Sequence, residues 1–307
     1  MASIRSKIWS RIISREIGKV KEIKDTSDIR KDFSGDSRIL KANYWKKDKK
    51  IRYSNFNIDN LPVLKLENKE IQSNKTLLYL HGGGYVACGP ETHGALITEL
   101  SLIAKTHVLF PIYRLAPEHP FPAAIEDALS SYKYLLNEGI DSREIFIAGD
   151  SAGGGLTMAL LQKIKEENLS RPACAIVISP WTDLTLSGKS IIERKDRDPM
   201  IKMDPGSNVI VDAYCGGEDP KNPLISSIFA DLEGMPPIQI QVASEESIFD
   251  DSTRLFDRLK ECGNKEIDFF EWKGLFHVFQ AFCSGWLAIP EAKKSLKMIS
   301  DFVDKYI

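Results

Sequence analysis

The feature that most constrains this chain is the pentapeptide Gly-Asp-Ser-Ala-Gly at 149–153, which stands between an apolar run and a helical segment. The run at 145–149 reads IFIAG and suits a buried strand, and a helix is expected over 151–167. A serine in a sharp strand-to-helix turn needs small neighbours and stands clear of the sheet at the positive end of the helix dipole. The motif alone is common by chance, but this placement predicts that Ser151 is a nucleophile.

A second glycine cluster, His-Gly-Gly-Gly at 81–84, directly follows the apolar run TLLYL. Three consecutive glycines leave backbone N–H groups uncovered, which the oxyanion of an acyl-transfer reaction requires. A phosphate-binding loop is the alternative, but neither G-x-x-x-x-G-K-[ST] nor G-x-G-x-x-G is present. We therefore predict an oxyanion loop at 82–84.

A hydrolytic serine needs a general base, and the chain has five histidines, of which only His277 follows Ser151. In enzymes built around this turn, the order along the chain is serine, acid, histidine. His277 also lies in a predicted loop between the last strand and the last helix. Four acids precede it in a suitable loop: Glu245, Glu246, Asp250 and Asp251. The two aspartates begin a predicted helix, where acids stabilise the N-terminal dipole, and spacing alone does not choose between the glutamates.

From residue 51 onward, apolar runs alternate with helical segments, which predicts a mostly parallel sheet covered on both faces. Strands are expected at 51–58, 61–66, 76–80, 107–113, 145–149, 173–179, 238–243 and 267–271. Helices are expected at 92–105, 122–137, 151–167 and 248–262 and from about 291. The alternation breaks at 183–235, where three Asp-Pro pairs surround a short helical stretch near 207–214. Such an excursion between two strands is a suitable place for a lid.

The formal net charge of −2 conceals an uneven distribution, because residues 1–52 contain 16 Lys and Arg against seven Asp and Glu. Apolar residues recur at helical spacing from Ile4 to Val20 and predict a basic amphipathic helix. A membrane-surface anchor is one interpretation, but the narrow aliphatic face favours a helix packed on the main body. Residues 24–50 show no clear period and are expected to be a loosely ordered connection.

The expected location and partners of the protein rest on three kinds of sequence signal that are not found: a secretory signal, a membrane helix and a metal-binding pattern. No secretory signal is recognisable, and no run approaches the ~20 apolar residues of a membrane helix. The five cysteines have no paired spacing and no zinc-binding pattern. We expect a cytoplasmic protein that needs no metal or cofactor and binds no nucleic acid. Membrane contact is not expected, and a homodimer through an exposed last strand or helix is one option.

Five motifs together resemble the hormone-sensitive-lipase group of α/β-hydrolases, the bacterial family IV esterases. They are HGGGY at 81–85, YRLAPEHPFPAAIEDA at 113–128, GDSAGG at 149–154, SPWTDLT at 179–185 and GLFHVFQAF at 274–282. The resemblance runs from about residue 77 to the C-terminus. It implies an α/β-hydrolase domain at 51–184 and 226–307, capped by helices at 1–50 and by an insertion at 185–225.

The resemblance also implies roles for single residues. Its acid precedes a paired Asp-Asp by four residues, which selects Glu246 over Glu245, although many relatives have Asp there. The implied site residues are the triad Ser151, Glu246 and His277, the oxyanion donors Gly83, Gly84 and Ala152, and the substrate contacts Tyr85 and Asp150. His81 would be structural, and Arg114 and Glu118 would form an internal ion pair.

The activity implied is that of a serine carboxylesterase acting on short-to-medium acyl esters of small molecules through an acyl-enzyme. Two alternatives use the same fold. One is an interfacial lipase that docks through the basic N-terminal helix and acts on longer chains. The other is a ligand receptor without catalysis, which the presence of the serine, the histidine and the glycine loop disfavours.

Overall fold

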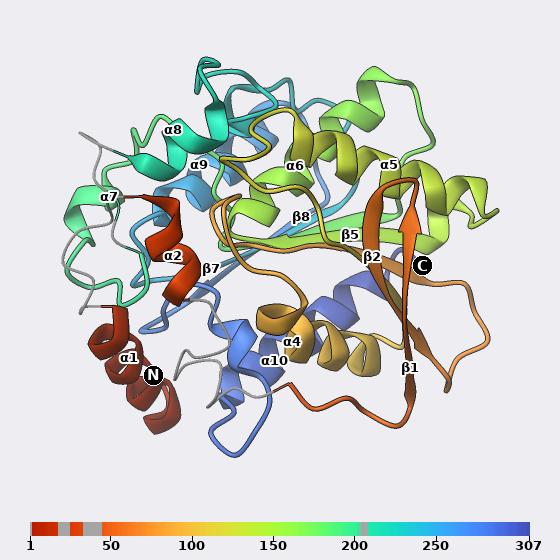
Figure 1. The fold of residues 1–307 in the computed structure, drawn as a ribbon, viewed down its shortest axis with the longest axis horizontal. Coiled ribbons are helices and arrows are strands. Elements are labelled where there is room, and N and C mark those ends of the chain that lie inside the picture. Colours follow the sequence, from red (N-terminus) through yellow and green to blue (C-terminus); the bar gives the residue numbers. More distant parts are fainter. Residues whose placement is uncertain (1, 18–24, 33–44, 202, 204–207) are drawn as a thin grey trace.

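The computed structural model describes residues 2–17, 25–32, 45–201, 203 and 208–307, and its centre is one eight-stranded sheet (Figure 1). The strands are β1 (Ile51–Ile58), β2 (Leu61–Asn68), β3 (Thr76–Leu80), β4 (His107–Pro111), β5 (Ile145–Asp150), β6 (Cys174–Ile178), β7 (Ile238–Ala243) and β8 (Ile267–Trp272). Their order across the sheet is β1-β2-β4-β3-β5-β6-β7-β8. The β1–β2 and β2–β4 pairs are antiparallel and all others are parallel. The predicted mostly parallel sheet is confirmed.

Helices cover both faces of this sheet. The main ones are α4 (Pro90–Ile103), α5 (Ala123–Asn137), α6 (Ala152–Glu166), α9 (Phe249–Glu261) and α10 (Pro290–Val303). Helices α5, α6 and α9 contribute to the core on one face, and α4 and α10 to the core on the other (Figure 1). Every residue of β3, β5, β6 and β7 is buried. Those strands were recognisable as apolar runs because a parallel strand between two helical layers has no solvent face.

The N-terminal helix α1 (Ile4–Ile17) packs on the body, as expected. Trp9 is 1% exposed, its ring centroid lies 4.5 Å from that of Phe282, and its Nε1 donates a hydrogen bond to the carbonyl of Leu287. Ile13 is also buried, while Ile4 is exposed. The contact is therefore made by one narrow stripe of the helix.

A second helix, α2 (Thr26–Asp32), forms where a loosely ordered connection was expected, and for these residues that expectation was wrong. The carboxylate of Asp25 accepts a hydrogen bond from the N–H of Ser27, which satisfies the helix start. Ile29 is buried in the core. One buried apolar side chain and one cap therefore stabilise this short helix, although its sequence has no periodic apolar pattern. Residues 24 and 33–44 of the predicted connection lie outside the described residues, as do residues 18–20 of the predicted N-terminal helix.

The excursion at 183–235 contains α7 (Ser190–Glu193), α8 (Val209–Cys215) and the short η2 (Ser227–Phe229). The side chain of Asn208 caps α8 by accepting hydrogen bonds from the N–H groups of Ile210 and Val211, and Gly216 ends it in the left-handed conformation. This is the helical stretch expected near 207–214. Helix α2 lies beside α8, so segments far apart in sequence meet at one side of the molecule (Figure 1). The boundaries of a cap domain stay a prediction.

Candidate active site

Ser151 sits at the turn between β5 and α6 with backbone angles φ 53° and ψ −122°. A positive φ is strained for a side-chain-bearing residue and persists only where the surroundings enforce it. The glycines on either side of Ser151 permit the close backbone packing that enforces this conformation. A Cβ on Gly149 would lie 2.1 Å from the carbonyl oxygen of Gly153, and one on Gly153 would lie 2.0 Å from that of Leu80. The predicted elbow is therefore present in its expected form.

The glycine loop lies directly against this serine. A Cβ built on Gly82 would be 3.1 Å from the Cβ of Ser151. Gly83 and Gly84 adopt φ values of 110° and 63°, which turn the loop in a way that favours glycine. Within the described chain, the backbone N–H groups of Gly83, Gly84 and Ala152 donate no hydrogen bond. They are thus available to an oxyanion.

Asp150 holds the glycine loop in place from beneath. Its buried carboxylate accepts hydrogen bonds from the Tyr79 hydroxyl at 2.7 Å and the Gly82 N–H at 3.2 Å, and it lies 3.2 Å from Nε2 of His93. Burial alone would raise the pKa of Asp150, but His93 and the Tyr79 hydroxyl bring it below its ordinary value. These contacts support a structural role, while the expected contact between Asp150 and substrate stays a prediction. The roles of Tyr79 and His93 were not predicted, because the only sequence signal of these residues is their place in a buried strand and a helix.

His81 is fully buried and stacks on Tyr113 with ring centroids 4.2 Å apart. Its Nδ1 is 2.7 Å from the carbonyl oxygen of Gly82, and burial lowers its pKa to about 3. The ring is therefore neutral at physiological pH. These contacts match the structural role expected for it.

His277 meets Glu246 at the carboxyl end of the sheet. Nδ1 of His277 lies 3.0 Å from Oε2 of Glu246, and both side chains are buried. Oε1 of Glu246 accepts hydrogen bonds of 2.6 Å from the Ala243 N–H and from the Ser179 hydroxyl. Glu245 instead forms a two-bond ion pair with Arg197, in which both side chains are partly exposed. The structure thus brings Glu246, and not Glu245, to the histidine.

Burial opposes the charged form of His277, but its hydrogen bond to Glu246 and the negative charges of Glu246, Asp198 and Asp150 outweigh it. The pKa of His277 is consequently raised above its ordinary value. An imidazole in this setting is a strengthened base. That property suits a group that must take a proton from a serine hydroxyl.

The end of β6 connects the serine to the histidine. The Ser151 N–H donates a hydrogen bond of 2.9 Å to the carbonyl of Ile178. The hydroxyl of the next residue, Ser179, accepts one of 3.3 Å from the N–H of Val278. Ser151 and His277 therefore both lie at the carboxyl edge of the parallel strands, where α/β sheets place their ligands.

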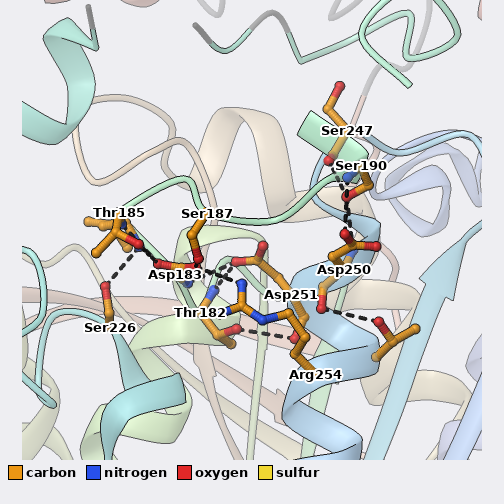
Figure 2. Close-up of polar contacts among 12 residues, drawn as sticks. Thr182, Asp183, Thr185, Ser187, Ser190, Ser226, Ser247, Asp250, Asp251 and Arg254 are labelled. Carbon is orange, nitrogen blue, oxygen red and sulfur yellow. Dashed lines mark hydrogen bonds and ion pairs between the residues drawn. The ribbon is translucent and has the colours of Figure 1, made fainter. Parts of the chain in front are cut away.

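The loop that carries Glu246 is fastened to the start of the insertion (Figure 2). The Ser190 hydroxyl donates a hydrogen bond of 2.7 Å to the Ser247 carbonyl and accepts one of 3.0 Å from the Asp250 N–H. One residue further, Oδ2 of Asp251 accepts hydrogen bonds from the N–H groups of Thr182 and Asp183 at 2.7 and 2.8 Å. The two aspartates lie in the first turn of α9, as expected, but Asp251 also binds backbone far along the chain.

The aromatic side chain of Tyr85 is 1% exposed and stacks on Tyr214 of α8, with centroids 3.7 Å apart and planes at 6°. Ile210, one turn earlier on α8, approaches the glycine loop, since its Cγ2 would lie 3.0 Å from a Cβ on Gly84. Helix α8 thus covers the oxyanion loop. The proposed contact of Tyr85 with substrate stays a prediction.

The predicted ion pair between Arg114 and Glu118 is wrong. Arg114 binds Asp127 at 2.8 Å and Glu126 at 2.9 Å on α5, while Glu118 binds Arg30 of α2 at 2.6 Å. Both residues do anchor the loop after β4, but each uses a partner that the tertiary structure supplies. Arg30 also donates hydrogen bonds to the carbonyls of Val86 and Ala116, at 2.7 and 2.8 Å.

All five cysteines are free thiols, and no helix among the described residues combines the length and apolarity needed to cross a bilayer. In the same part of the chain, no three His, Cys, Asp or Glu side chains are grouped so that they could hold a metal ion.

The chain is similar in sequence to known hydrolases. A family model described as the alpha/beta hydrolase fold matches residues 77–281, which includes the glycine loop, Ser151 and His277. The chain belongs to the α/β-hydrolase family. An acetyl-hydrolase of Streptomyces hygroscopicus is 39% identical to this hydrolase over 233 residues, which are 76% of each chain. An esterase of Acinetobacter venetianus is 33% identical over 233 residues, again 76% of each chain.

Solved structures resemble the hydrolase over nearly its whole length. A crystal structure of an esterase from the bacterial hormone-sensitive lipase family has a TM-score of 0.90 at 32% identity and covers 100% of this chain and 99% of its own. A hormone-sensitive lipase from a metagenome library has a TM-score of 0.86 at 32% identity, covering 98% and 99%. The hydrolase is therefore a carboxylic ester hydrolase of the hormone-sensitive-lipase group.

Proposed function

We propose that this hydrolase cleaves short-to-medium acyl esters through a Ser151–His277–Glu246 triad and an acyl-enzyme. The observation that carries the proposal is the buried contact between His277 Nδ1 and Glu246 Oε2, at 3.0 Å, at the same sheet edge as the strained Ser151. Because Glu246 engages Nδ1, the other ring nitrogen is left as the basic one. A base oriented in this way by a third group is the arrangement that activates a serine.

In the proposed reaction, His277 Nε2 removes the hydroxyl proton of Ser151 as the Oγ attacks the ester carbonyl. The oxyanion that forms accepts hydrogen bonds from the N–H groups of Gly83, Gly84 and Ala152. His277 then gives its proton to the departing alcohol, and Ser151 is left acylated. Water, deprotonated by His277, attacks the acyl carbon, and collapse of the second tetrahedral intermediate releases the acid and the free serine.

Contacts from the proposed cap segments support a preference for shorter acyl chains. Ile210 of α8 reaches the glycine loop, and Tyr214 stacks on Tyr85 immediately after it. Arg30 of α2 binds the carbonyl of Val86 in the same segment. Side chains from both proposed cap segments therefore lie against the oxyanion loop or the residues that directly follow it, which supports a limit on the length of the acyl chain.

The test is a panel of p-nitrophenyl esters from acetate to palmitate, measured for the parent and for Ser151→Ala. We expect kcat/KM to be highest between acetate and octanoate and to fall by several orders of magnitude in the alanine variant. One solved relative was soaked with p-nitrophenyl butyrate, which makes the butyrate ester a sensible member of the panel. Highest activity on emulsified long-chain esters would instead indicate an interfacial lipase. An alanine variant as active as the parent would overturn the triad.

A further inference from the structure

The insertion places a second carboxylate, that of Asp198, against the residue that follows Glu246. Asp198 is 0% exposed. Its Oδ2 accepts a hydrogen bond of 2.8 Å from the N–H of Ser247, the residue directly after Glu246. Its Oδ1 accepts hydrogen bonds from the N–H groups of Met200 and Ile201, at 2.9 and 3.1 Å. One carboxylate therefore joins a turn of the insertion to the loop that carries the proposed triad acid.

Holding this turn with a buried carboxylate is energetically costly. Burying its charge costs free energy, and a neutral side chain could accept some of the same backbone hydrogen bonds. Burial raises the pKa of Asp198 above its ordinary value, although the charge of His277 and the three backbone N–H groups act in the opposite direction. Three carboxylates in turn raise the pKa of His277 by electrostatic attraction, and their effects decrease in the order Glu246, Asp198 and Asp150. In its ionised form, Asp198 thus acts on His277 in a way that a neutral acceptor would not reproduce.

The other charged groups between these two segments have different partners. Arg197 pairs with Glu245, and their side chains are 53% and 26% exposed. Arg194 donates a hydrogen bond to the Ser244 carbonyl, and its guanidinium lies 3.7 Å from the centroid of the Phe249 ring. These contacts also fasten the acid-bearing loop, but none involves His277. Breaking the ion pair between Arg197 and Glu245 therefore serves as a control. It removes one contact that holds the loop but none of the carboxylates that act on His277.

We propose that Asp198 is a positioning residue for the catalytic base: it fixes the backbone beside Glu246 and adds a second buried negative charge beside His277. The inference rests on the proposed role of His277 as general base. The imidazolium forms when His277 takes the Ser151 proton, and a nearby fixed negative charge stabilises it more than it stabilises the neutral ring. Asp198 thus works with Glu246 without touching the substrate.

The activity test compares the pH dependence of kcat/KM for p-nitrophenyl acetate in the parent, Asp198→Asn and Glu245→Gln. Removing the charge at 198 lowers the pKa of His277, so the base stays neutral in more acidic solution. The acid limb of the Asp198→Asn profile should move to lower pH by about one unit, as expected for the loss of one nearby charge. Its plateau should fall by about tenfold, because the base is less well placed. Glu245→Gln should leave the acid limb where it is.

Asp198→Glu should restore the parent's acid limb at least in part, since it keeps the charge. Asp198→Ser, a smaller neutral replacement, provides a second variant if the asparagine protein does not fold. The proposal fails if a folded neutral variant keeps the parent's acid limb, or if Glu245→Gln moves it equally. Failure of both neutral variants to fold would assign Asp198 to stability alone and would equally overturn the proposal.

A titration of the His277 ring by NMR, with His277→Gln used for assignment, separates this inference from the proposed function. The measurement needs no ester hydrolysis. A parent that hydrolyses no ester would contradict the proposed function, while a lower His277 pKa in Asp198→Asn would still support the electrostatic coupling. Conversely, an active enzyme whose His277 titrates identically in the parent and in Asp198→Asn would overturn the inference and leave the triad intact.

Discussion

The hydroxyl of Ser179 donates a hydrogen bond of 2.6 Å to Oε1 of Glu246 and receives one from the N–H of Val278, the residue after His277. One small side chain at the end of β6 therefore contacts both the proposed acid and the loop of the proposed base. Hydrogen bonds to a charged group are worth about 1.5–3 kcal/mol, so this one is expected to fix the orientation of the carboxylate.

Ser179→Ala should lower kcat/KM by roughly tenfold, because Glu246 loses a donor and gains freedom to turn away from His277. Steady-state hydrolysis of p-nitrophenyl butyrate measures the effect. Ser252→Ala is the matched control, since Ser252 is equally buried and its hydroxyl has no hydrogen-bond partner among the described residues. An unchanged rate in Ser179→Ala would show that the carboxylate holds its place without this bond.

Glu246→Gln should reduce kcat by about 10³–10⁴-fold, as neutral replacements of a triad acid do. The two donors at Oε1, from Ala243 and Ser179, orient the amide so that its NH₂ group faces His277 Nδ1 and favours the wrong tautomer. Glu245→Gln, which breaks only the pair with Arg197, should stay within about threefold of the parent. Equal losses in the two variants would count against Glu246 as the triad acid.

Arg30→Ala should lower kcat/KM by about tenfold while the protein stays folded. The guanidinium clamps the carbonyls of Val86 and Ala116, so its loss frees the segment that follows the oxyanion loop. Glu118→Gln is the comparison, because it weakens the ion pair but leaves the two backbone contacts of Arg30 in place. Thermal unfolding of each variant, beside its kinetics, distinguishes a displaced loop from general instability.

Asp251→Asn should change how stability depends on pH. Burial, with the neighbouring charge of Asp183, raises the pKa of Asp251 to about 8. Between the ordinary aspartate pKa and this value, the folded chain binds a proton that the unfolded chain lacks. The free energy of unfolding contributed by this group therefore falls as pH rises through that window, by about 1.4 kcal/mol per pH unit.

Asparagine can keep both backbone hydrogen bonds of Asp251, because the N–H groups of Thr182 and Asp183 bind the same oxygen. The expected result is a curve of unfolding free energy between pH 4 and 8 that declines less steeply than the parent's, measured by urea denaturation. A variant curve parallel to the parent's would show that Asp251 is ionised throughout.

The strands were predictable because their causes are local. TLLYL, IFIAG and the run before Ser179 are almost entirely apolar, and each forms a strand buried on both faces. The elbow was equally predictable, since only glycine fits where a Cβ on Gly153 would meet the carbonyl of Leu80. Helix α2 was not, because its stability comes from one cap and from Ile29 buried against distant residues.

Long-range pairing was the least predictable feature. Arg114 and Glu118 are close in sequence, yet Arg114 binds α5 and Glu118 binds α2. Asp198 carries no recognisable signal, because its place beside Ser247 depends on how the insertion folds back over 49 residues of sequence separation. A prediction from sequence spacing favours partners that are close along the chain. Ion pairs instead form between groups that packing brings within a few ångströms of each other in space.

The sequence by itself determined the order and burial of the strands, the glycine turns beside Ser151, and the position of one histidine beyond it, because these depend on apolar patterning and local backbone sterics. Spacing in the sequence did not choose between Glu245 and Glu246, and the family resemblance selected Glu246; the tertiary structure is what brings Glu246 to His277. Two adjacent residues on a loop point in different directions, and only the packing of β6, β7 and the insertion buries one carboxylate against the imidazole and leaves the other with Arg197.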